Sequence, residues 1–496
     1  MAKVPRFIAV LLGLLLVSSG CTATAPTQES PTLTVGATLE PPTLNPFENT
    51  AASIAQVLLY NVYETLAKVD SNGELQPLLA KSWDVSDDRT QYTFHLDENA
   101  KFPSGKAVDA DAIVANVDRL LSDDKLSGTL KTQLAVIDSA KRIDDTTVEI
   151  KLKTPSVMWL YDMTSQLGMI IDPSASVDLS KESAGSGPYK VKQYNKDKTI
   201  ILERNQGYWG SAPKFDEVVF RYFDDPNAMN TAMLAGDLDV ISNLQAPDAL
   251  AQFQSDPQFS TIVGTTNGEV VLGLNHDNKA LAKKEVREAL TMAIDRKALM
   301  DTVWNGQGTL IGTMTVPTDP WYEDLANHTP YDPDKAKELL AKAGESDLKL
   351  RFRVPVVPYA VKSAQFVASS LRDIGVDAEV EELEFSRWIT EVLTDGNYDM
   401  TVVSHVEARD FGKFADKDYY WHYADPAFVK LYKEADQSAP DQATEKFKEA
   451  ARLLADDYAA IWLWALPNLV VTKADIHGVS PNMATLSFDI TGIERS

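Results

Sequence analysis

The second half of the chain alternates strand-like and helix-like segments, and this alternation constrains the fold more than any other feature. Apolar runs that favour strands occupy residues 270–274, 348–354 and 378–383. Between them, apolar residues recur at helical spacing in 285–300 and 360–374. Helices that alternate with strands along a chain cover both faces of a sheet whose strands run in one direction. The sequence therefore predicts an α/β fold built on a parallel sheet.

The length of the chain indicates more than one domain. Its 496 residues are too many for a single hydrophobic core. Residues 73–180 differ in character, because short strand signals at 83–85 and 92–96 flank an Asp-rich turn. We expect lobe I to comprise residues 33–72, 181–266 and 472–496, an inserted α+β subdomain to comprise 73–180, and lobe II to comprise 267–471.

The N-terminus has the pattern of an export signal. Lys3 and Arg6 precede an apolar run at 7–17, which is too short to span a bilayer stably. We therefore expect residues 1–20 to be a signal peptide. Residues 21–32 are rich in Thr, Pro, Ala, Ser and Gln, which predicts a flexible tether.

Cys21, the single cysteine of the chain, directly follows the small residues that end the signal. A lone cysteine cannot form an internal disulfide. Its position resembles the lipobox of bacterial lipoproteins, in which the cysteine becomes the lipid-modified N-terminus. The resemblance implies a protein anchored by lipid to the outer face of the cytoplasmic membrane, on the periplasmic or cell-surface side. The alternative is an ordinary cleaved signal followed by a free cysteine.

Charge and motif content exclude several classes of function. The formal net charge of −25 argues against nucleic acid as a partner and against binding anionic lipids through a broad basic patch. The chain has no G-x-S-x-G elbow, H-E-x-x-H helix or P-loop. None of its six histidines is spaced from another as on a metal-binding helix face. We therefore expect no enzyme activity, no cofactor and no metal site.

Residues 398–423 have the composition of a cleft wall. A buried-looking strand at 399–403 leads into a loop that holds four polar residues, and a cluster of aromatic rings follows. Ligands of open α/β sheets bind beyond the carboxyl ends of strands, where rings supply apolar contact and a few charges fix orientation. The polar residues are His405, Glu407, Arg409 and Asp410, and the rings include Tyr419 and Trp421. The alternative is a surface loop whose aromatic side chains pack inward.

Several separated motifs resemble one family in its own order. The stretches are LAKSW at 79–83, YTFHL at 92–96, ERNQGYWG at 203–210, VREALTMAIDR at 286–296 and DPDKAKELLAKAG at 332–344. They are similar to the hallmark stretches of bacterial extracellular solute-binding proteins of family 5. The similarity extends over roughly residues 33 to 471.

The resemblance implies a two-lobed, periplasmic-binding-protein-like (type II) fold that closes around a solute. It also implies a monomer that delivers short peptides to a permease powered by separate ATPase subunits of an ABC importer. The alternative solute is a nickel chelate, an opine-like compound or an oligosaccharide. Two other hypotheses are an exported hydrolase, which would need a nucleophile–base pair or a metal site, and a peptide receptor that works without an importer.

The resemblance also suggests roles for individual residues. In peptide-binding members, an Asp in the loop after this strand pairs with the ligand's α-ammonium, and Asp410 is the best match, with Glu407 in reserve. Arg409 would either bind the ligand carboxylate or neutralise Asp410. A metal chelate at His405 and His422 is the alternative use of this loop. The weaker cleft candidates are Tyr60, Asn275 and Trp464.

Overall fold

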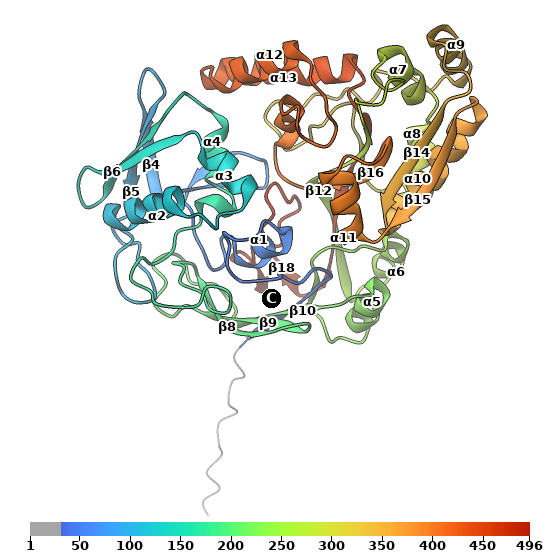
Figure 1. Cartoon of the computed structure of the whole chain (residues 1–496). Helices are drawn as coiled ribbons and strands as arrows, with labels where there is room; N and C mark the ends of the chain where they lie inside the picture. The colour runs from blue at the N-terminus through green and yellow to red at the C-terminus, as the bar shows by residue number, and fades with distance from the viewer. Residues whose placement is uncertain (1–30) are drawn as a thin grey trace, which may run out of the picture.

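The computed structural model describes residues 31–496, and one large mixed sheet runs through it (Figure 1). The sheet has eleven strands in the order β15-β14-β16-β12-β17-β11-β1-β10-β9-β8, with β13 paired to β17. The strands of lobe I are β1 (Thr32–Ala37), β8 (Tyr189–Asn195), β9 (Thr199–Arg204), β10 (Glu217–Tyr222) and β11 (Val240–Ile241). Those of lobe II are β13 (Thr309–Leu310), β14 (Lys349–Pro355), β15 (Asp377–Leu383) and β16 (Met400–His405).

Two long strands connect the lobes, β12 (Phe259–Leu274) and β17 (Ile461–Lys473). Their antiparallel pairing is interrupted by a register shift between Thr265, which faces Pro467, and Glu269, which faces Ala465. A shift of this kind bends a strand pair and increases its twist locally. Residues 265–269 and 465–467 therefore form the crossing between the lobes, which we call the hinge.

The prediction of a wholly parallel sheet is wrong. The pairs β14–β15, β14–β16, β1–β10 and β1–β11 are parallel, whereas β12 runs antiparallel to both β16 and β17. The local alternation of strands and helices predicts crossovers between neighbours in sequence. It contains no information about β16 and β17, which reach β12 from more than a hundred residues away.

Lobe II surrounds its part of the sheet with helices on both faces. The elements are α7 (Lys284–Met292), α8 (Arg296–Trp304), α9 (Pro333–Ala343), α10 (Pro358–Asp373), α11 (Phe385–Trp388), α12 (Pro426–Asp436) and α13 (Pro440–Asp456). The single helix expected at 285–300 is in fact α7 and α8. Asp295 separates them, because its carboxylate accepts a hydrogen bond from the backbone N–H of Ala298 and caps α8.

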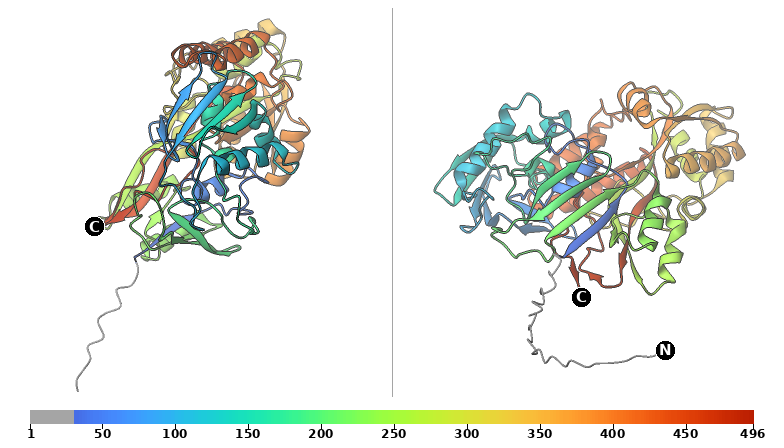
Figure 2. Two further views of the ribbon diagram at one scale, coloured as in Figure 1. Left: turned by 90° about the vertical axis from the view of Figure 1, so that its left-hand side faces the viewer. Right: turned by 90° about the horizontal axis from the view of Figure 1, so that it is seen from below.

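The inserted subdomain contains a four-stranded antiparallel sheet in the order β4-β5-β7-β6. Its elements are β4 (Ala80–Val85), β5 (Gln91–Leu96), α2 (Ala110–Ser122), α3 (Gly128–Leu134), β6 (Ile137–Arg142), β7 (Thr147–Leu152) and α4 (Met158–Asp162). The expected hairpin is β4–β5. Figure 2 shows this subdomain beside lobe I.

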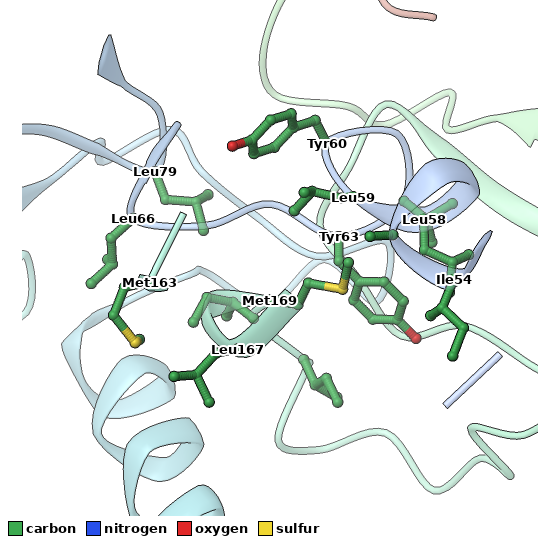
Figure 3. Close-up of a cluster of buried hydrophobic side chains, with 14 of the residues drawn as sticks. Ile54, Leu58, Leu59, Tyr60, Tyr63, Leu66, Leu79, Met163, Leu167 and Met169 are labelled. Atoms are coloured by element: carbon green, nitrogen blue, oxygen red, sulfur yellow. The ribbon is translucent and has the colours of Figure 1, made fainter. Parts of the chain in front are cut away.

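Lobe I and the inserted subdomain share one hydrophobic core. Ile54 and Leu58 of α1 (Ala52–Leu58) pack in the same cluster as Met163, Leu167 and Met169 from the subdomain (Figure 3). Helix α1 is shorter than the expected helix at 51–66, because the chain leaves helical geometry at Leu59 and Tyr60 has a φ of 64°. The remaining elements are β2 (Ala67–Val69), β3 (Leu75–Pro77), α5 (Pro226–Leu234), α6 (Leu250–Gln254), β18 (Ile476–His477) and β19 (Glu494–Arg495).

Candidate functional site

Two cavities lie next to the hinge. The first, the hinge cavity, has a volume of about 70 Å³ and is lined by Asn267 of β12, Trp304 and Val406 of lobe II, and Leu244 of lobe I, among others. The second, the lobe I cavity, has a volume of about 240 Å³ and is lined mainly by residues 68–71 and 479–489 together with Tyr60 and Asn468. Met483 and Thr485 line both cavities. The space between the lobes at the hinge is therefore the candidate site.

Arg409 reaches across from the loop after β16 to the other side of the cleft. Its backbone adopts a φ of 60°, and its Nη2 donates a hydrogen bond to the carbonyl oxygen of Gly73, 2.9 Å away. Its guanidinium carbon lies 4.1 Å from the ring centroid of Tyr161 in the inserted subdomain. The side chain is thus held by a carbonyl and a ring of the opposite lobe. It makes no hydrogen bond to Asp410, and its Nε has no partner among the described residues.

Asp410 is buried, and its carboxyl group is poorly satisfied. Its Oδ1 has no hydrogen-bond partner within residues 31–496, and its Oδ2 lies 3.7 Å from Nδ1 of His405. Burial, against an opposing effect of Lys413 and with added effects of Glu407 and Asp319, raises the pKa of Asp410 to about 8. At neutral pH the carboxyl is therefore mostly protonated until a cation reaches it.

Glu407 already has a cationic partner inside the protein. Its carboxylate lies 2.7 Å from Nζ of Lys413, and the same ammonium lies 5.2 Å from the ring centroid of Tyr419. Glu407 is thus less suited than Asp410 to receive a cation from a ligand. Tyr419 itself packs against Trp421, with ring centroids 4.8 Å apart.

Two further buried acids belong to this site, and the sequence analysis did not identify them. Glu269 is 1% exposed, and its Oε2 has no partner in the described part of the chain. Burial, then the carboxyls of Asp410 and Asp319, raise the pKa of Glu269 well above its ordinary value. Burial also raises the pKa of Asp319, whose Oδ2 accepts a hydrogen bond from the N–H of Val316. The sequence does contain a signal that could have identified Glu269, because it is the only charged residue of β12, whose other residues are apolar or neutral.

The two histidines of this region, His405 and His422, each contact a different side chain. Nε2 of His405 lies 2.9 Å from the hydroxyl of Tyr420, and burial lowers the pKa of His405 to about 3, so the ring is neutral. Nδ1 of His422 lies 3.9 Å from a carboxylate oxygen of Asp277. Within residues 31–496, no three His, Cys, Asp or Glu side chains are grouped so that they could hold a metal ion.

The other predicted site residues have mainly structural positions. The hydroxyl of Tyr60 donates to the carbonyl oxygen of Thr164 at 2.7 Å, although Tyr60 also lines the lobe I cavity. Asn275 donates from Nδ2 to two carbonyl oxygens that follow α11. Trp421 stacks on Phe414, with centroids 3.9 Å apart, and Trp464 is fully buried. Most of the rings at 411–423 thus pack inward against α12 and α13 in the core of lobe II.

A second contact joins the lobes at the rim of the cleft. Oδ1 of Asp436, at the end of α12, accepts hydrogen bonds from the hydroxyl of Ser156 at 2.8 Å and the N–H of Met158 at 2.9 Å. The carbonyl oxygen of Asp436 accepts from the N–H of Val157. Figure 1 shows α12 and α13 at the top of the molecule, next to the inserted subdomain. The lobes are therefore held together both at the hinge and at the rim.

Comparisons with known proteins agree with this architecture. Residues 74–427 match the model of "Bacterial extracellular solute-binding proteins, family 5 Middle". The nickel-binding periplasmic protein of Escherichia coli is 28% identical over 64% of this chain, and the match covers 65% of that relative, just under two thirds of its length. Di/tripeptide-binding protein 1 of Pseudomonas aeruginosa is 24% identical over 84% of this chain and 85% of the relative.

A solved structure shares the fold over nearly the whole chain. The ABC transporter-associated periplasmic binding protein DppA of Helicobacter pylori, in complex with the peptide STSA, has a TM-score of 0.80 and 22% sequence identity. The match covers 94% of this chain and 98% of that chain. The two-lobed α/β fold predicted from the sequence is confirmed.

Proposed function

The chain belongs to the bacterial extracellular solute-binding proteins of family 5, and we propose that it captures short peptides between its two lobes for an ABC importer. The observation that carries the peptide assignment is Asp410, a buried carboxyl in the loop after β16 with one unsatisfied oxygen. A free peptide carries an α-ammonium, which needs a carboxylate partner when it is removed from water. Relatives named as di/tripeptide-binding and dipeptide-binding proteins support the same solute class.

The proposed mechanism is binding and closure without a chemical reaction. The solute enters the open cleft, and its ammonium pairs with Asp410, which then gives up its proton. Closure brings Arg409 against Gly73 and Tyr161, and Asp436 against residues 156–158. A solute that binds the closed form more tightly shifts the population toward it. The permease and ATPase subunits of the importer are the proposed partners, and the receptor acts as a monomer.

Native mass spectrometry of purified residues 22–496, followed by denaturation and identification of the released molecule, tests the proposal. We expect a distribution of short peptides. The alternative solute is a metal chelate, which the similarity to a nickel-binding relative favours. A single chelate, sugar or other defined mass would overturn the peptide assignment and leave the fold and the importer role in place. A protein that purifies empty is then titrated with di- and tripeptides, and failure of all of them to bind would equally refute it.

We also propose that the mature protein is tethered by lipid to the outer face of the cytoplasmic membrane. The predicted signal peptide, Cys21 and most of the tether lie outside the described residues. Within residues 31–496, no helix is both long and apolar enough to cross a membrane. Cys21→Ser is expected to release the protein from membrane fractions, because the site of acylation is lost. Immunoblots of membrane and soluble fractions measure this, and unchanged membrane retention would contradict the lipid anchor.

A further inference from the structure

Glu269 occupies the point where the chain crosses between the lobes. It is the first residue of β12 after the hinge register shift, and it pairs with His405 on β16 and Ala465 on β17. The two residues before it, Asn267 and Gly268, line the hinge cavity. Its backbone is therefore held on both sides by strands, next to the space that a solute would fill.

No cationic side chain within residues 31–496 pairs with the carboxyl of Glu269. The two nearest candidates on the loop after β16 are engaged elsewhere: Arg409 contacts Gly73 and the ring of Tyr161, and Lys413 pairs with Glu407. The charged groups that act on Glu269 are the carboxyls of Asp410 and Asp319, both of the same sign. A buried carboxylate without a partner is costly, so Glu269 must hold a proton or receive a cation from outside.

Two unsatisfied amide groups line the cavities next to the hinge. Nδ2 of Asn267 and Oδ1 of Asn468 are buried and have no hydrogen-bond partner among residues 31–496. Asn267 lines the hinge cavity and Asn468 the lobe I cavity. One is a donor and the other an acceptor, and peptide C=O and N–H groups are the matching partners of such atoms. Buried polar groups are rarely left unpaired in a functioning state.

We infer that Glu269 is a specificity-determining residue that selects peptides with a second positive charge close to the α-ammonium, namely peptides whose first residue has a basic side chain. This inference rests on the proposed function. The α-ammonium pairs with Asp410, and the side-chain ammonium or guanidinium pairs with Glu269. The carboxyl of Asp410 is near enough to raise the pKa of Glu269, and two cations supplied together allow both acids to ionise. In the competing role, Glu269 stays protonated and donates a hydrogen bond to a carbonyl oxygen of the peptide.

Calorimetric titration at pH 6.5 with Lys-Ala, norleucine-Ala and Ala-Ala tests the inference. Lysine and norleucine share a four-carbon stem and differ in the charged group. The wild type is expected to bind Lys-Ala at least about tenfold more tightly than norleucine-Ala. Glu269→Gln should bring this ratio to about one while norleucine-Ala affinity stays within about threefold. The exposed Glu379→Gln on β15 is the control and should keep the wild-type ratio.

Calorimetry in buffers that differ in ionisation enthalpy measures how many protons are released on binding. This test needs no variant. Lys-Ala should release one more proton than norleucine-Ala on binding, because Glu269 ionises only for the dication. Equal affinities and equal proton release in the wild type would overturn the role of Glu269 and leave peptide binding intact. A preference that survives in Glu269→Gln would also overturn it. If none of the three peptides binds the wild type, the proposed function itself fails.

Discussion

Asp410→Asn is expected to weaken the binding of a free peptide by roughly 30-fold or more, and to change the binding of its N-acetylated form by only a few fold. Asp410 is buried, and its partly satisfied carboxyl can neutralise an α-ammonium placed beside it. Asparagine preserves the shape but leaves the ammonium unpaired in a site of low dielectric, which costs about 2–5 kcal/mol. An acetylated peptide has no such charge to lose. Calorimetry with a matched pair of free and acetylated peptides measures the difference.

Glu407→Gln is the matched control for this experiment. Glu407 lies in the same loop but already pairs with Lys413, so its loss should weaken free and acetylated peptides alike and only modestly. Equal losses for the two peptides in Asp410→Asn would refute the assignment of Asp410. A larger selective loss in Glu407→Gln would transfer the role to Glu407.

The affinity for a monocationic peptide is expected to follow a bell-shaped pH profile with its maximum near pH 8. The pKa of Asp410 is raised to about 8, chiefly by burial. Below this pH binding releases the proton of Asp410, so affinity should rise by up to about tenfold per pH unit. Above it the peptide's own amine, with a pKa of about 7.7–8.0, loses its charge and affinity falls.

The other groups around Asp410 should not produce this profile. His405 is neutral across the range, because burial lowers its pKa to about 3. Burial also raises the pKa values of Glu269 and Asp319, and we expect a monocationic solute to displace neither proton. Titrations from pH 5.5 to 9.5 measure the profile. In Asp410→Asn the rising limb should disappear, and a rising limb of unchanged slope would contradict the assignment of the titrating group.

The position of the main acid could be predicted from the sequence, whereas its surroundings could not. Asp410 follows a short apolar strand that the pattern identifies, and the family resemblance assigns it a role. The expectation that its neighbour Arg409 would neutralise it depends on where a flexible side chain points. In the structure Arg409 turns to Gly73, which lies 336 positions away in sequence. A loop sequence alone cannot specify such a distant partner.

The aromatic residues show the same limit. The sequence marks a cluster of rings at 411–423, but it does not state which side of them the protein covers. Helices α12 and α13 pack over Phe411, Phe414 and Tyr423 and bury them in the core of lobe II. Conversely, the sequence around Glu269 has the apolar pattern of a buried core strand. Glu269 nevertheless adjoins the cleft, because the register shift occurs just before it.

The sequence by itself determined the class of fold, most of the strands and helices, the inserted subdomain's hairpin and the family. These features depend on residue periodicity, capping and motifs, which are local properties of the chain. The tertiary structure alone decided the mixed direction of the sheet, the hinge at residues 265–269 and the gathering of Glu269, Asp319 and Asp410. The physical reason is that strand pairing and burial are set by contacts between segments far apart in sequence, and these contacts determine which charges lose their water.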